Sequence, residues 1–240
     1  MPKIAIIATS ATHFTTATGE KKGPTGVWLE EIATPYYQFL SKQFSVEFFS
    51  IEGGEIPVDN GSRAEGFYTE DSKKFDEDSR AREMMMKNTK SIASIDVEEF
   101  DGIFLPGGHG CCEDFYGNAD LAKVIETFYE AKKAVGLDCH APIALLSCKK
   151  ADGKTPFLKG LNVTGFSDAE ETAVGYHEAV PVMIEKEMIA QGAIYTKAEA
   201  DWGAYAVTDG NLVTGQNPAS SAVCVQKYIE LMTLKMTMTN

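Results

Sequence analysis

The sequence lacks any apolar run of about 18 residues, the length that a membrane-spanning helix requires, so we expect no membrane partner. Basic residues are also scarce, since 22 Lys and Arg stand against 35 Asp and Glu and the net charge is −13 with neutral His. This charge repels a phosphate backbone, and we therefore expect no nucleic acid partner.

Cysteine patterns typical of metal sites and secreted domains are missing. The chain has five Cys, an odd number, and none of them forms the CxxC pair of a zinc site. The first nine residues contain a short apolar run without the length and cleavage site of a signal peptide. We therefore expect free thiols, no metal, and a reducing, cytoplasmic location.

The chain of 240 residues, with 44% hydrophobic and 24% charged residues, is typical of a globular protein. Short apolar runs alternate with amphipathic patterns, which predicts an α/β fold: one domain (1–240) with a mainly parallel sheet covered by helices on both faces. Residues 52–94 are rich in glycine and charge, and we interpret them as an inserted segment outside the sheet. The expected strands are 3–8, 45–51, 100–105 and 134–138, the expected helices are 27–39, 78–91, 121–134, 141–146, 172–191 and 219–234, and a type I′ hairpin turn is expected at Asp209-Gly210.

Residues 134–142 have the pattern of a strand, a sharp turn and a helix. The apolar strand runs into Cys139 and His140, and Pro142 suits the first turn of a helix. This layout is typical of a nucleophile elbow. A helix N-terminus at the turn would lower the pKa of the Cys139 thiol and populate the thiolate. The alternative is a buried structural cysteine.

Two further stretches could complete such a site, because functional residues of parallel sheets gather at the carboxyl ends of strands. The turn at Gly107, Gly108 and His109 follows a strand, and its N–H groups could hold an oxyanion together with that of His140. Glu30 and Glu31 lie on the first helix. Such acids are usually solvated, but a carboxyl buried near a thiol could stay protonated and transfer a proton.

Five motifs together give the chain its resemblance to the ThiJ/PfpI superfamily, which has a flavodoxin-like, class I glutamine amidotransferase-like fold. Within it, the chain is most similar to the branch of glyoxalase III enzymes and heat-shock chaperones. The motifs are GVWLEEIATP at 26–35, FLPGGHG at 104–110, CHAP at 139–142, GFSDAEE at 165–171 and VTDGNLVTGQNP at 207–218.

The resemblance implies residue roles. Cys139 would be the nucleophile beside His140, Glu31 would be the acid and base, and Glu171 would orient His140, with Glu170 one position away from that role. Gly108 would hold the oxyanion, with Gly107 and His109 in the same turn. The chain departs from the family pattern at two positions: Ala141 replaces a glycine, and Asp138 replaces an apolar or small residue, where a carboxylate would raise the thiol pKa.

The activity implied is conversion of methylglyoxal and related 2-oxoaldehydes to 2-hydroxy acids without glutathione. No cofactor is expected, and the sequence has no Rossmann glycine fingerprint, Walker motif or HExxH. Two alternatives stay open: a PfpI-type cysteine hydrolase or amidase, and a holdase chaperone or redox-stress protein. The expected partners are a small 2-oxoaldehyde, a second copy of the chain in a homodimer and, for a holdase, unfolded client proteins.

Overall fold

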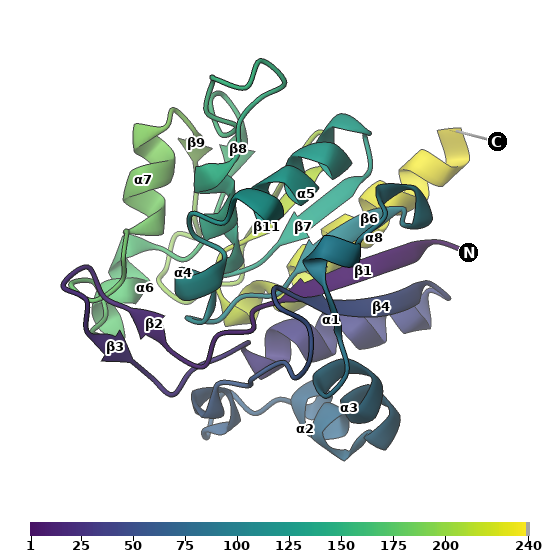
Figure 1. Ribbon diagram of the computed structural model, residues 1–240, viewed down its shortest axis with the longest axis horizontal. Coiled ribbons are helices and arrows are strands. Elements are labelled where there is room, and N and C mark those ends of the chain that lie inside the picture. The colour runs from purple at the N-terminus through teal and green to yellow at the C-terminus, as the bar shows by residue number, and fades with distance from the viewer. Residues whose placement is uncertain (239–240) are drawn as a thin grey trace.

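The computed structural model describes residues 1–238 and has a central seven-stranded sheet (Figure 1). The strand order is β10-β11-β7-β6-β1-β4-β5, and all neighbours are parallel except the β10–β11 pair. The predicted α/β class is confirmed. The strands are β1 (Lys3–Ala8), β2 (Phe14–Thr15), β3 (Lys21–Lys22), β4 (Ser45–Ser50), β5 (Lys90–Ser91), β6 (Gly102–Leu105), β7 (Ala134–Leu137), β8 (Asn162–Val163), β9 (Ile194–Tyr195), β10 (Ala206–Asp209) and β11 (Leu212–Gly215).

Helices cover both faces of this sheet. The α-helices are α1 (Leu29–Ser41), α2 (Glu70–Glu77), α3 (Ser79–Met86), α4 (Cys111–Asp114), α5 (Ala119–Glu130), α6 (Asp168–Ala173), α7 (Ile184–Ala190) and α8 (Ser221–Met238). The 3-10 helices are η1 (Asn60–Arg63), η2 (Ile92–Ser94), η3 (Val97–Glu99), η4 (Ala141–Ser147) and η5 (Pro218–Ser220). Within residues 1–238, none of these helices combines the length and the apolarity needed to cross a membrane.

The alternation of side chains along β1 divides the core into two layers. Ala5 and Ile7 pack into the cluster formed with α5, η4 and α7, whereas Ile4 and Ile6 pack into the cluster formed with α1 and α8. A parallel strand buried on both faces explains why the sequence at 3–8 is apolar throughout. Figure 1 shows α5 and α1 on opposite sides of the sheet.

Three sequence predictions were wrong in detail. The helix expected at 172–191 is two short helices, α6 and α7, because Gly175 has φ of 81° and Pro181 follows in the connection. The helix expected at 141–146 is the 3-10 helix η4. The hairpin loop is Gly210-Asn211 and only Gly210 has a positive φ, whereas a type I′ turn requires two such residues.

The segment 52–94 carries α2 and α3 and packs beside α1. Phe75 of α2 is fully buried and meets the Tyr36 ring of α1 at 6.0 Å between centroids. The last residues of the segment are not outside the sheet, because β5 pairs in parallel with the end of β4. The segment therefore contributes the edge strand as well as two helices.

Candidate active site

Cys139 lies at a sharp bend between β7 and η4, at the carboxyl edge of the sheet. Its φ is 59°, in the left-handed region that costs a non-glycine residue roughly 1–2 kcal/mol. Two hydrogen bonds hold the bend: the Cys139 N–H donates to the Gly215 carbonyl at 3.1 Å, and the Phe166 N–H donates to the Cys139 carbonyl at 2.9 Å. This is the strand–turn–helix layout that the sequence predicted.

His140 connects the Cys139 thiol to Glu171. The Cys139 Sγ lies 3.3 Å from His140 Nδ1, and His140 Nε2 lies 2.7 Å from Glu171 Oε2. Burial, followed by the neighbouring His109, lowers the pKa of His140. A neutral ring that donates from Nε2 to a carboxylate has a bare Nδ1, so the network assigns to His140 the tautomer that can accept the thiol proton.

The other carboxylate oxygen of Glu171 contacts a second histidine. His109 Nε2 lies 2.8 Å from Glu171 Oε1, and the His109 and His140 rings are 4.0 Å apart. Burial would raise the pKa of Glu171, but the contacts with both imidazoles outweigh it and the net pKa is lowered. The sequence indicated a substrate contact for His109 and missed this link, for which its only signal was the histidine in the glycine-rich turn.

Glu170 has a structural position, which separates it from Glu171. It forms a capping box with Ser167 at the start of α6. Its Oε1 accepts hydrogen bonds from the Trp202 N–H at 3.0 Å, Gln216 Nε2 at 3.0 Å and Asn217 Nδ2 at 2.7 Å. Glu170 therefore holds three loops together, and Glu171 is the acid that faces His140.

Glu31 is fully buried on the first turn of α1. Its Oε2 accepts the Gly107 N–H at 2.7 Å, its Oε1 has no hydrogen-bond partner among the described residues, and the carboxyl and the Cys139 thiol affect each other's pKa. Burial, followed by the charge of Asp138, raises the pKa of Glu31 well above its usual value. A buried carboxyl of raised pKa near the sulfur suits a proton carrier, whereas half-buried Glu30 is bound by the hydroxyl groups of Thr34 and Thr69.

The surroundings of Cys139 oppose the expected thiolate. The residue is only 2% exposed, and burial, then Glu31 and Asp138, raise its pKa well above the usual value. The sequence indicated the opposing effect of Asp138 on the thiol pKa, and the fold adds the effect of Glu31, which α1 brings near the sulfur. A thiol in this site must lose its proton to a neighbouring base before it can attack.

The glycine turn approaches the elbow closely, but only part of it can hold an oxyanion. The Gly107 N–H is committed to Glu31, which corrects its predicted role. Within residues 1–238, neither the Gly108 N–H nor the His140 N–H has an acceptor. Gly108 has φ of 112°, and a Cβ there would lie 2.3 Å from the Gly26 carbonyl oxygen, so only glycine fits. These two N–H groups are the candidate oxyanion donors.

Among the described residues, the candidate metal ligands are His109, His140 and Glu171, whose ligand atoms lie within 4.8 Å of one another. Their mutual hydrogen bonds at 2.7 and 2.8 Å already satisfy the carboxylate. The structure thus provides a hydrogen-bonded use for every member of this group.

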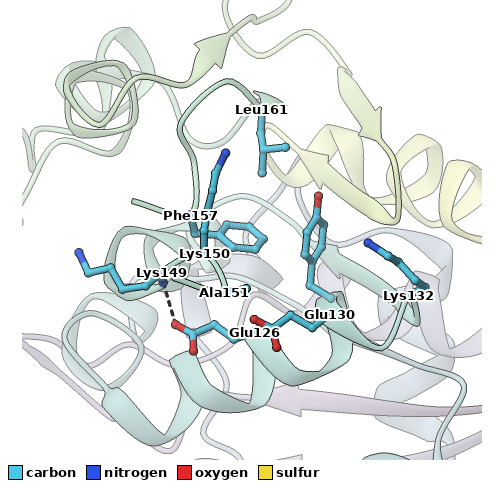
Figure 2. Close-up of a pocket in the computed structure, with 9 residues that line it drawn as sticks. Glu126, Glu130, Lys132, Lys149, Lys150, Ala151, Phe157 and Leu161 are labelled. Atoms are coloured by element: carbon cyan, nitrogen blue, oxygen red, sulfur yellow. Dashed lines mark hydrogen bonds between the residues drawn. The ribbon is translucent and has the colours of Figure 1, made fainter. Parts of the chain in front are cut away.

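Two cavities differ in their relation to the site. One of about 440 Å³ adjoins it, since its wall includes Trp28 and Glu30 of the Glu31 segment and Trp202, which contacts Phe166 beside His140. Figure 2 shows another of about 230 Å³ near the amino end of β7, where none of the predicted site residues lies. That second cavity is lined by Glu126, Tyr129, Glu130, Lys132, Lys149, Lys150, Ala151, Phe157 and Leu161.

Known proteins share this fold over its whole length. The chain is 29% identical over 234 residues to Glyoxalase 3 of Candida albicans, covering 95% of this chain and 98% of that protein. The crystal structure of glyoxalase III from Candida albicans matches with a TM-score of 0.83 and 26% identity, over 96% of this chain and 97% of the other. Rapid Encystment Protein 24 KDa of Francisella tularensis matches with a TM-score of 0.87 and 31% identity, over 97% and 99%. The DJ-1/PfpI family model matches residues 26–231, and the chain therefore belongs to the DJ-1/PfpI family.

Proposed function

We propose that this protein is a glutathione-independent glyoxalase that converts methylglyoxal and related 2-oxoaldehydes to 2-hydroxy acids. The observation that carries the proposal is the fully buried Glu31 carboxyl, which acts electrostatically on the Cys139 thiol, while that thiol lies 3.3 Å from His140 Nδ1. Relatives named as glyoxalases, alignable over nearly the whole chain, support it. Five free, buried thiols also suit the reducing, cytoplasmic location that we propose.

The reaction begins with the Cys139 thiol. His140 Nδ1 accepts the thiol proton, and Glu171 stabilises the imidazolium that forms. The sulfur then attacks the aldehyde carbon and gives a hemithioacetal. The Gly108 and His140 N–H groups lie where the former aldehyde oxygen acquires negative charge, so they stabilise it.

Glu31 then moves a proton between the two substrate carbons. Its carboxylate removes the proton from the carbon bound to sulfur and delivers it to the former ketone carbon. The first carbon is oxidised and the second is reduced, so no external oxidant or cofactor takes part. The former aldehyde oxygen becomes the thioester carbonyl, and the proton held by His140 passes to the former ketone oxygen, which becomes the hydroxyl. Water then adds to the thioester carbonyl, the 2-hydroxy acid leaves, and a proton of that water restores the Cys139 thiol. A carboxyl with a raised pKa suits both transfers, because it is a stronger base when ionised and a proton donor otherwise.

The test is consumption of methylglyoxal and formation of lactate by purified protein without glutathione. Cys139→Ala and Glu31→Gln should each lower kcat/KM by at least about 100-fold, the scale of nucleophile and acid–base contributions. Cys148→Ala is the matched control, because this thiol is buried away from the triad and contacts the Ala144 carbonyl. Normal turnover by Cys139→Ala would rule out the mechanism.

A cysteine hydrolase is the second candidate, because Cys139, His140 and Glu171 with two open N–H groups also suit attack on an acyl carbon. The role of Glu31 distinguishes the two activities. A hydrolase would turn over amides or esters with Glu31→Gln nearly as active as wild type, whereas a glyoxalase requires Glu31 for the transfer between carbons.

A further inference from the structure

Asp138 places a second buried carboxyl directly before the nucleophile. The residue is fully buried, and its Oδ2 accepts a hydrogen bond from the Ser221 hydroxyl of α8 at 3.0 Å. Its Oδ1 is also buried and has no hydrogen-bond partner. A carboxyl with an unsatisfied buried oxygen is costly to ionise, so this position needs an explanation.

The fold leaves room for this carboxyl at Gly215. A Cβ at Gly215 would lie only 2.2 Å from Asp138 Oδ1 and 3.0 Å from the Cys224 Cβ. Any other residue at this position would therefore displace the carboxyl. The space beside Gly215 of β11 thus accommodates the Asp138 carboxyl, at the position before the cysteine where the family pattern has an apolar or small residue.

The groups around Asp138 are acids rather than cations. Glu31 and Glu30 face it from α1, Cys139 follows it at the elbow, and Cys224 faces it from α8. Within residues 1–238, no Lys, Arg or His forms an ion pair with Asp138 or Glu31. Lys227 of α8 acts on the Cys224 thiol, Glu31 acts on the Cys111 thiol of α4, and Cys111 acts on Cys139. A negative charge on Asp138 is therefore not neutralised locally and acts on its neighbours.

We propose that Asp138 is a positioning residue whose charge controls how readily the Cys139 thiol and the Glu31 carboxyl lose their protons. This inference rests on the proposed roles of those two groups. When Asp138 is ionised, its charge holds both neighbours protonated. When it is neutral, both ionise more readily, and the thiol becomes available for attack.

The expected sign follows from the order of ionisation. Burial, opposed by the Ser221 hydrogen bond, raises the pKa of Asp138 to about 7. Above this value Asp138 is charged, so it is charged throughout the higher range in which the Cys139 thiol titrates, and it opposes the ionisation of that thiol. Removal of the charge should shift the thiol titration to lower pH.

The experiment measures the rate of Cys139 alkylation by iodoacetamide against pH, with the modified peptide identified by mass spectrometry. Asp138→Asn should lower the midpoint by about one pH unit, within the range for a close like charge. Below the midpoint this corresponds to about tenfold faster alkylation. The pH profile of kcat/KM should move in the same direction, which a purely structural role would not produce.

Two variants test the assignment further. Glu130→Gln changes the net charge equally at an exposed position of α5 and should leave the titration in place. Ser221→Ala keeps the carboxyl but removes the hydrogen bond that favours its charge, so alkylation near neutral pH should quicken. If Asp138→Asn does not fold, the alkylation rate of Ser221→Ala tests the inference instead.

An unchanged alkylation midpoint in folded Asp138→Asn, or an unchanged rate in Ser221→Ala where only that variant folds, would overturn the inference. Alkylation reads the thiol without turnover. If Asp138→Asn shifts the alkylation midpoint but the wild type does not consume methylglyoxal, the electrostatic role of Asp138 stands and the glyoxalase proposal fails. If the wild type consumes methylglyoxal but the midpoint does not shift, the glyoxalase proposal stands and the role of Asp138 fails.

Discussion

Asp138 should make the free energy of unfolding depend on pH, and Asp138→Asn should remove this dependence. The pKa of this carboxyl is raised from 3.8 to about 7 in the folded chain. Between these values the native state holds a proton that the unfolded state has lost, so stability falls as pH rises and the loss is complete above about pH 7. Two pH units of this window, at about 1.4 kcal/mol each, amount to about 3 kcal/mol.

Urea unfolding at about pH 5 and about pH 8 measures this difference directly, with an unchanged m-value as the check on two-state behaviour. The asparagine amide adds a donor where the carboxyl has only acceptors, but the cost of a buried unpaired group, about 1–3 kcal/mol, is the same at both pH values. From about pH 5 to about pH 8, the free energy of unfolding of Asp138→Asn should therefore rise by about 3 kcal/mol relative to that of the wild type. Parallel pH dependence in the two proteins would refute the reasoning.

Other expectations follow from neighbouring contacts. Glu170→Ala should lower the free energy of unfolding by about 2–4 kcal/mol in urea titrations, since it leaves three buried donors unpaired, whereas Glu171→Gln should mainly lower kcat. Gly215→Ala should cost about 1–3 kcal/mol by overpacking, and Asp138→Ala in the same chain should restore most of it in a double-mutant cycle. Trp202→Ala should raise KM for phenylglyoxal more than for methylglyoxal in steady-state assays, because the indole lines the adjoining cavity.

The elements that carry the site could be predicted from local pattern. The run before Cys139 is apolar throughout because β7 is buried on both faces, and Pro142 marks the turn into η4. The breaks inside 172–191 were also readable, since Gly175 and Pro181 both disfavour a continuous helix. The apolar spacing of this segment favours one helix, but the two helix-breaking residues prevail over it.

The choice between two adjacent acids shows what local pattern can and cannot resolve. Ser167 and Glu170 have the spacing of a capping box, which assigns Glu170 to the start of α6 and leaves Glu171 for another role. No local signal places His109 against Glu171, because the contact joins segments 62 residues apart. The raised pKa of the Cys139 thiol has one local cause, the adjoining Asp138, and one that local pattern does not place, the Glu31 carboxyl that α1 brings to the site.

The left-handed backbone of Cys139 has a consequence for the evolution of this chain. Glycine adopts that conformation without the steric cost borne by a residue with a Cβ, so Cys139→Gly would relieve roughly 1 kcal/mol of backbone strain while removing the sulfur. The same substitution would also free the backbone of the unfolded chain and leave a void in the core, so glycine offers no simple gain in stability and the bend keeps its strain together with its side chain.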